Sequence, residues 1–177
     1  NKLVPFGEFL PLENILSKMG LKTLTNNYLS YTASSERKLF NLHKNSSIKF
    51  LPLICYEIIY SGEISKDKDY DFIVNISEDG WFGDSIGPHQ HFAHSIFRSV
   101  EYGKYTLRSA NNGISAIVAP TGLIVDKLEI NNKGVISINE IINANKTLFS
   151  TYGNKIYFLI ILLYIFLIFS FKKMENE

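Results

Sequence analysis

The residues with the clearest chemical potential are Cys55, Tyr56 and Glu57, which follow an apolar run from Phe50 to Ile54. The run predicts a buried strand in a sheet covered on both faces, and this strand would deliver the thiol into a polar group. A cysteine held there on a sharp turn can act as a nucleophile once a base removes its proton. The same pattern also fits a cysteine that is only a small buried apolar side chain. The stretch by itself leaves both interpretations open.

Glu8 is a second candidate for chemistry. It lies in the segment Leu3–Leu12, whose two prolines and one glycine predict a shaped loop and exclude a regular helix. Its neighbours are apolar, and such a setting tends to raise the pKa of a carboxyl group unless a cation or a hydrogen-bond donor offsets it. The alternative is a glutamate that faces solvent on a turn.

Trp81 and Phe82 belong to an unusual loop between Glu78 and Pro88. The loop combines three glycines and a proline with the only tryptophan of the chain. Loops of this composition often form walls or lids that face a ligand. An aromatic plug that closes the core from outside is the alternative.

His91 and His94 lie one turn apart on a helix predicted over His89–Lys104 and could bind a metal together. No cysteine or carboxylate falls in register with them, so the spacing does not predict a metal site.

The overall composition limits the classes of protein to consider. The chain has 177 residues, 46% of them hydrophobic, which is enough for one domain with a core. A single cysteine allows no internal disulfide. Lys and Arg together number 18 against 17 Asp and Glu, and no basic stripe for nucleic acid is present. The chain opens on Asn1 without an initiator methionine or a signal sequence, so we expect a fragment of a longer protein.

The elements that must position these residues alternate between strands and helices early in the chain and form hairpins later. The early pattern predicts helices at Leu12–Met19, Ile58–Lys66 and His89–Lys104, and strands at Phe50–Ile54 and Tyr70–Ile76. The later pattern predicts strands at Tyr105–Ala110, Ile114–Ala119, Leu123–Ile130 and Val135–Ile138, with turns at Asn111–Gly113 and Asn131–Gly134. We therefore expect a layered α/β domain with a mixed sheet over residues 1–140, followed by a linker over 141–154.

The far end of the chain is strongly apolar. Ile156–Phe171 is a run of sixteen residues in which Ser170 is the only small polar member, with lysines on both sides. The pattern predicts a transmembrane helix over 155–173 and a tail over 174–177. The run makes about 24 Å of helix, which is short of the roughly 30 Å hydrocarbon core of a bilayer. Lys172 and Lys173 favour a cytoplasmic C-terminus for this helix. The alternative to a transmembrane helix is a helix buried in the core of the protein.

Four motifs, taken in order, resemble the bacterial apolipoprotein N-acyltransferases, which are membrane enzymes with a periplasmic domain of the nitrilase superfamily. The motifs are Leu-Val-Pro-Phe-Gly-Glu at 3–8, Ile-Cys-Tyr-Glu at 54–57, Asn-Ile-Ser-x-Asp-x-Trp-Phe-Gly at 75–83 and Gly-Pro-x-Gln-His at 87–91. Asn-Asn-Gly at 111–113 and the terminal apolar helix extend the resemblance over most of the chain. It implies the C-terminal part of a nitrilase-like α-β-β-α sandwich followed by one transmembrane helix.

The resemblance also implies a Glu-Lys-Cys triad in which Cys55 is the nucleophile. Lys2 falls on a histidine of the family pattern, so the catalytic lysine would lie one residue before Asn1 and the base glutamate further upstream. Glu8 matches a second, supporting glutamate, and Glu57 matches a functional carboxylate beside the nucleophile. We therefore expect the chain to be inactive alone.

By the same resemblance, Cys55 would take an acyl chain from a phospholipid as a thioester and pass it to the α-amine of a diacylglyceryl-cysteine on an apolipoprotein. Tyr56, Trp81 and Phe82 would contact substrate, and no metal or organic cofactor is needed. The enzyme would sit in the bacterial inner membrane with its catalytic domain in the periplasm. Glu78 departs from the asparagine that is usual in the tryptophan loop, which puts the hydrogen bonding of that loop in doubt.

Two other functions remain possible from the sequence. A nitrilase-type amidase or carbamoylase could use the same triad on a small amide, although such an enzyme has no need of a membrane anchor. A non-catalytic, membrane-anchored remnant could keep Cys55 only as a packing residue.

Overall fold

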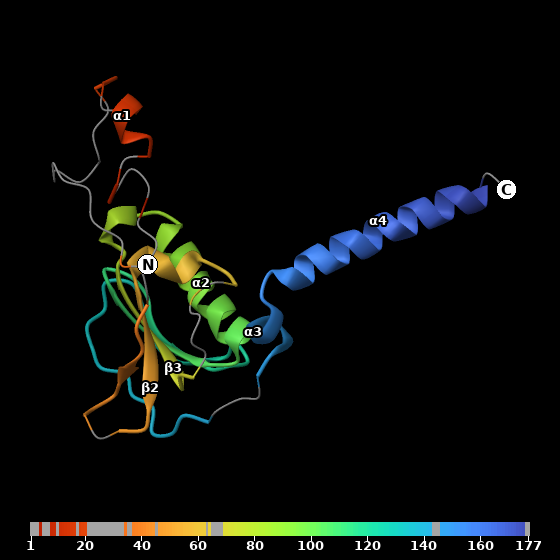
Figure 1. Ribbon diagram of the computed structural model, residues 1–177. Coiled ribbons are helices and arrows are strands. Elements are labelled where there is room, and N and C mark those ends of the chain that lie inside the picture. The colour runs from red at the N-terminus through yellow and green to blue at the C-terminus, as the bar shows by residue number, and fades with distance from the viewer. Residues whose placement is uncertain are drawn as a thin grey trace.

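The computed structural model describes residues 4, 8–9, 11–16, 18–20, 34, 37–44, 46–62, 64, 69–142 and 146–175. Within these residues the chain forms a six-stranded sheet in the order β1-β2-β3-β4-β5-β6 (Figure 1). The strands are β1 (Phe40–Asn41), β2 (Lys49–Ile54), β3 (Phe72–Glu78), β4 (Tyr105–Asn111), β5 (Ser115–Val118) and β6 (Ile124–Leu128).

The centre of the sheet is parallel and its two sides are antiparallel. β3 pairs in parallel with both β2 and β4, whereas β1, β5 and β6 add antiparallel strands. Parallel neighbours require a crossover connection, and the helix α2 (Gly87–Tyr102) provides it between β3 and β4. The predicted α/β domain with a mixed sheet is confirmed.

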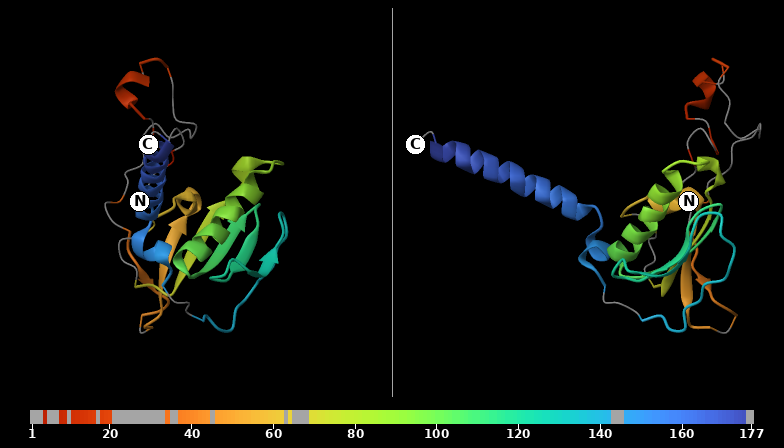
Figure 2. Two further views of the ribbon diagram at one scale, coloured as in Figure 1. Left: turned by 90° about the vertical axis from the view of Figure 1, so that its right-hand side faces the viewer. Right: turned by 180° about the vertical axis from the view of Figure 1, so that it is seen from behind.

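α2 confirms the helix predicted over His89–Lys104, but it begins and ends two residues earlier, at Gly87 and Tyr102. Pro88 occupies the first turn, where a missing N–H costs nothing, and Gly103 ends the helix in the left-handed conformation at φ 63°. Phe92 and Ile96 on its buried side pack against Ile114, Ala116 and Val118 at and next to β5. This contact covers one face of the sheet (Figure 2).

The expectation that both faces of the sheet are covered holds only in part for the described residues. Leu51 and Leu53 of β2 are fully buried in a core with Ile58 and Ile73, but Ile54 is 67% exposed and Ile76 is 59% exposed. Side chains alternate between the two faces of a strand, so Ile54 and Ile76 lie on the face opposite this core, where Phe72 of β3 is buried.

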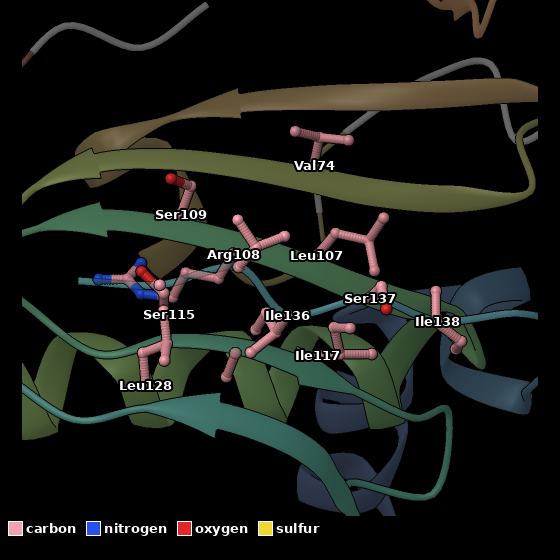
Figure 3. Close-up of a pocket in the computed structure, with 13 residues that line it drawn as sticks. Val74, Leu107, Arg108, Ser109, Ser115, Ile117, Leu128, Ile136, Ser137 and Ile138 are labelled. Carbon is pink, nitrogen blue, oxygen red and sulfur yellow. The ribbon is translucent and has the colours of Figure 1, made fainter. Parts of the chain in front are cut away.

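On the face opposite α2, the segment 134–138 crosses the sheet and borders an open pocket of about 440 Å³. Val74, Leu107 and Ile117 line it from three strands, and Ile136 and Ile138 line it from the crossing segment (Figure 3). The prediction of a strand at Val135–Ile138 is wrong. β6 pairs with β5, and residues 135–138 form no strand.

Two short helices differ from the predicted ones. α1 covers only Glu13–Leu16 of the expected Leu12–Met19. The helix expected at Ile58–Lys66 begins earlier, as the 3₁₀ helix η1 (Cys55–Ile59), and residues 63 and 65–68 lie outside the described part. A second 3₁₀ helix, η2 (Gly80–Phe82), forms in the tryptophan loop.

The C-terminal part consists of α3 (Leu148–Tyr152) and α4 (Lys155–Glu175). α4 projects from the body as a long arm (Figures 1 and 2), and most of its large apolar side chains are exposed. The expected transmembrane helix over 155–173 is not confirmed, because none of the helices in the described part of the chain has the length and apolar character needed to cross a bilayer.

A group of polar contacts ties the base of α4 to the segment after η1. Asn154 Nδ2 donates to the Ser61 carbonyl at 3.2 Å, and Ser61 Oγ donates to Glu101 Oε1 at 2.9 Å. Glu101 also pairs with Arg98 at 2.8 Å, and Thr147 Oγ1 donates to the Glu101 carbonyl. The start of α4 is therefore held beside the chain that leaves the Cys55 turn.

Candidate functional site

Cys55 sits on a tight turn at the carboxyl end of β2. Its φ of 47° lies in the left-handed region, which residues other than glycine rarely adopt and which costs about 1–3 kcal/mol. The thiol is free and half-buried, and η1 begins at this residue. A strained backbone at the end of a parallel strand is a common way to present a reactive side chain.

The carboxylate of Glu57 holds this turn. Its Oε2 accepts the Ile54 N–H at 2.9 Å, and its Oε1 pairs with Arg37 Nη2 at 2.6 Å. Both side chains are nearly buried, with 11% and 12% exposed, and Arg37 also donates to the Ile64 carbonyl. Glu57 therefore joins Ile54, the residue before Cys55, to a nearly buried cation.

Ser77 and Asp79 reach the same edge of the sheet from the end of β3. The parallel pairing of Ile54 with Ile76 aligns the carboxyl ends of the two strands. Ser77 Oγ lies 3.7 Å from Cys55 Sγ and 2.7 Å from Asp79 Oδ1. The thiol is thus linked to a buried carboxylate through one hydroxyl.

Asp79 is the centre of a buried ionic group. Its Oδ1 lies 2.8 Å from His91 Nδ1, and its Oδ2 lies 2.7 Å from Arg108 Nη2. Burial alone would raise the pKa of Asp79, but the hydrogen bond from His91 and the Arg108 charge outweigh it and place this pKa below its usual 3.8. A Cβ at Gly113 would lie 2.2 Å from Asp79 Oδ2, so only glycine fits there.

Asn75 connects this ionic group to the backbone of the Cys55 turn. Its Nδ2 donates to the Leu53 carbonyl at 3.0 Å and to the Cys55 carbonyl at 3.4 Å, while its Oδ1 accepts from Arg108 Nη1. Arg108 Nε also donates to the Ile114 carbonyl at 3.1 Å. The amide and the guanidinium together fix β2, β3 and β4 around the thiol.

The aromatic residues form the outer side of the site. Trp81 is 76% exposed, which excludes a plug over the core, and Phe82 packs edge-on against His91 with ring centroids 5.6 Å apart. Tyr56 is half-buried and packs edge-on against Tyr60 at 5.7 Å.

Glu78 braces the tryptophan loop. Its Oε1 accepts the Gly80 N–H at 2.8 Å, and its Oε2 accepts from Asn111 Nδ2 at 2.6 Å. The carboxylate thus supplies hydrogen bonds to the loop that contains Trp81.

The structure brings Cys55, Tyr56 and Glu57 together on η1, as the sequence order requires. Trp81 and Phe82 follow β3 on η2. The contact found for Glu8 is local, because its Oε2 accepts the Val4 N–H at 2.9 Å within one turn of chain.

Ser77, Asp79 and His91 stand in the motifs at 75–83 and 87–91, but the sequence assigns them no role in the Cys55 site, and the motifs do not point to Arg108. A usable signal is present, since Arg108 is a charged residue in the strand predicted at Tyr105–Ala110 and Asp79 lies three residues after the strand predicted at Tyr70–Ile76. No group of residues in the described ranges has an arrangement that could hold a metal ion.

Comparison with known proteins identifies one family and relatives that share one name. Residues 3–141 match the carbon-nitrogen hydrolase family. The chain is 43% identical over 155 residues to the apolipoprotein N-acyltransferase of Rickettsia prowazekii, covering 86% of this chain and 30% of that protein. It is 41% identical over 135 residues to the apolipoprotein N-acyltransferase of Rhizobium rhizogenes, covering 76% and 25%. The chain thus spans between a quarter and a third of the length of these relatives.

Among solved structures, an amidase from Nesterenkonia sp. has a TM-score of 0.44 at 14% identity, covering 58% of this chain and 40% of that one.

Proposed function

Because this chain belongs to the carbon-nitrogen hydrolase family, we propose that Cys55 is the nucleophile of an enzyme that transfers acyl chains to the amino termini of apolipoproteins. The observation that carries the proposal is the left-handed turn at Cys55, which holds a free thiol 3.7 Å from the hydroxyl of a buried hydroxyl–carboxylate pair. A packing cysteine has no need of such a conformation, whereas a nucleophile that must stand clear of its strand does.

The reaction has two steps. The Cys55 thiolate attacks the ester carbonyl of a phospholipid, the carbon–oxygen bond breaks, and a lysophospholipid leaves with a proton on its oxygen. The α-amine of a diacylglyceryl-cysteine then attacks the thioester, the carbon–sulfur bond breaks, the acyl chain ends on nitrogen, and the proton lost by the amine restores the Cys55 thiol. Neither step calls for a metal or an organic cofactor.

The described residues contribute the nucleophile and the frame that holds it. Glu57 and Arg37 fix the turn, and Glu8 acts as a supporting carboxylate near the start of the domain. We assign the base glutamate and the oxyanion-binding lysine to the protein outside this chain, which accords with the short share of the relatives that the chain spans. Acyl transfer therefore requires the intact protein.

The acyl chain would lie on the apolar surface at the same edge of the sheet. Ile54 and Ile76 expose their side chains at the ends of β2 and β3, and Trp81 and Phe82 expose theirs on η2. Tyr56 completes this surface beside the thiol. Such an arrangement offers apolar contact close to a reactive group, as lipid substrates require.

We further propose that α4 contacts membrane lipid, with the catalytic domain on the periplasmic side of the bacterial inner membrane. Apolar side chains on all sides of α4 are more than 60% exposed, among them Phe158, Leu159, Leu162, Tyr164, Phe166 and Phe169. A surface of this size is covered by another apolar phase in a stable protein. Since both substrates are lipids, the bilayer is the phase that fits the reaction.

The test is acyl transfer by the intact protein. Phospholipid vesicles and a peptide with an N-terminal diacylglyceryl-cysteine are incubated with wild-type protein and with Cys55→Ala. The proposal expects an N-acylated peptide with wild type and none above background with the variant. Release of ammonia from small amides without peptide acylation would instead identify an amidase.

A further inference from the structure

The hydroxyl of Ser77 lies between two groups that can each accept its proton. Ser77 Oγ is 2.7 Å from Asp79 Oδ1 and 3.7 Å from Cys55 Sγ. A hydroxyl has one proton and two lone pairs, so it cannot donate to both groups at once. A bond to an ionised carboxylate is shorter and stronger than one to a neutral thiol. With a neutral thiol, Ser77 donates to Asp79 and turns its lone pairs toward Cys55.

Asp79 keeps other partners if Ser77 turns away. His91 Nδ1 lies 2.8 Å from Oδ1 and must carry a proton, because two acceptors would repel at that distance. Arg108 Nη2 donates to Oδ2 at 2.7 Å. All three side chains are at least nine-tenths buried. The Asp79 carboxylate therefore keeps its hydrogen bonds from His91 and Arg108 whether or not Ser77 donates to it.

We propose that Ser77 is a positioning residue whose hydroxyl turns from Asp79 to the sulfur when Cys55 loses its proton. The inference rests on the proposed function, since it concerns the nucleophilic form of Cys55. Ser77 transfers no proton in this step. The thiol proton leaves to the base, the sulfur keeps the electron pair, and the Ser77 O–H rotates to donate to the thiolate.

Charged groups from four elements face this part of the molecule. Asp79 follows β3 and opposes a negative sulfur, whereas Arg108 on β4 favours it. His91 on α2 is bound to Asp79, and Glu57 on η1 is occupied by the Ile54 N–H and by Arg37. Unlike these four groups, the Ser77 hydroxyl can redirect its hydrogen bond to the sulfur when the sulfur becomes negative.

The test is the rate at which iodoacetamide alkylates Cys55 in the intact protein as a function of pH. The thiolate is the reactive form, so the midpoint of the profile reports the ionisation of Cys55. Ser77→Ala should move the midpoint upward and lower the rate below it by about tenfold, the effect of losing one hydrogen bond to a charged group. Ser77→Thr, which keeps the hydroxyl, should stay near wild type. Ser109→Ala is the matched control, because Ser109 is exposed on the other face of β4.

Asp79→Asn gives a prediction of opposite sign. A neutral amide holds the Ser77 proton less strongly and removes a negative charge, so the midpoint should move downward. Far-ultraviolet circular dichroism checks that each variant is folded. A folded Ser77→Ala protein with the wild-type midpoint overturns the inference. If Ser77→Ala does not fold, an Asp79→Asn protein whose midpoint equals that of wild type overturns it. Neither the alkylation midpoint nor circular dichroism depends on acyl transfer. Failure of the proposed function is therefore distinguishable, because Cys55 would still react with iodoacetamide while no peptide is acylated.

Discussion

The Glu57 carboxylate accepts the backbone N–H of Ile54, the residue just before Cys55, at 2.9 Å. Its other oxygen pairs with Arg37 at 2.6 Å. One side chain therefore fixes the direction in which β2 ends and neutralises a buried cation. The conformation of the Cys55 turn depends on this double contact.

Removing Glu57 should destabilise the protein strongly. Glu57→Ala removes the carboxylate that pairs with a nearly buried guanidinium, and breaking such a pair typically costs about 3–5 kcal/mol, whereas Glu57→Gln keeps an acceptor for the Ile54 N–H and should cost less. Urea unfolding followed by circular dichroism measures both. Glu129→Ala is the control, because it removes an exposed pair with Lys127 and should change the free energy of unfolding by less than about 1 kcal/mol. Equal effects of Glu57→Ala and Glu129→Ala would rule out this role for Glu57.

The left-handed backbone at Cys55 predicts an unusual preference for glycine. Cys55→Gly should be more stable than Cys55→Ala by about 1 kcal/mol, because an L-residue pays roughly 1–2 kcal/mol in this conformation. Thermal unfolding of the two inactive variants measures the difference. At Ser109, inside β4, the order should reverse, with alanine the more stable of the two substitutions. If alanine is also preferred at position 55, the turn is not strained.

Asp79 should make stability depend on acid pH. Its pKa lies below 3.8 in the folded protein, since the bonds from His91 and Arg108 outweigh the effect of burial. The ionised group therefore stabilises the fold fully above pH 3.8, and this contribution is lost as pH falls through the folded pKa. Unfolding measured in urea from neutral to acid pH should show a steeper loss in wild type than in Asp79→Asn.

Glu101 changes the free energy of unfolding with pH in the opposite direction from Asp79. Its contribution is the reason for comparing wild type with Asp79→Asn. Burial raises its pKa above the usual 4.5, so its contribution is present below that pH and is lost as pH rises through the folded pKa. The difference between wild type and Asp79→Asn cancels this background. Parallel pH profiles for the two proteins would contradict the assignment of the acid dependence to Asp79.

α4 should bind lipid through its exposed apolar side chains. In flotation with phospholipid vesicles, the wild-type protein should rise with the lipid, and replacing Leu162 and Phe166 by arginine should lower the bound fraction at least tenfold, since each charge is costly in an apolar phase. Val135→Arg, at an exposed site of the body, is the matched control and should bind as wild type does. Equal flotation of all three proteins would show that α4 is not the lipid-binding segment.

Local patterns in the sequence predicted most of the fold. The apolar runs located β2 and β3, the helical pattern over His89–Lys104 located α2 to within two residues, and Asn-Asn-Gly located the β4–β5 turn, where Asn112 has a φ of 54°. These features depend on neighbours within a few residues. The segment 135–138 looked like a strand because its composition is apolar, but only tertiary pairing decides whether such a run joins a sheet.

The site was harder to predict than the fold. Cys55, Tyr56 and Glu57 are adjacent in sequence, so their grouping was visible. The contacts of Asp79 with His91 and Arg108 join a loop to a helix and to a strand 29 residues away, and they depend on the register of β3 with β4. The pairing between Glu57 and Arg37 spans 20 residues and was equally hidden.

If Cys55 carries the acyl chain, the mass of the peptide that contains it must increase. The intact protein is incubated with phospholipid vesicles without acceptor, denatured at low pH, digested and analysed by mass spectrometry. The Cys55 peptide should gain the mass of one acyl chain, neutral hydroxylamine should remove this mass, and adding diacylglyceryl-cysteine peptide before quenching should remove it as well. An unmodified Cys55 peptide in a preparation that still acylates the acceptor would show that Cys55 does not carry the acyl chain.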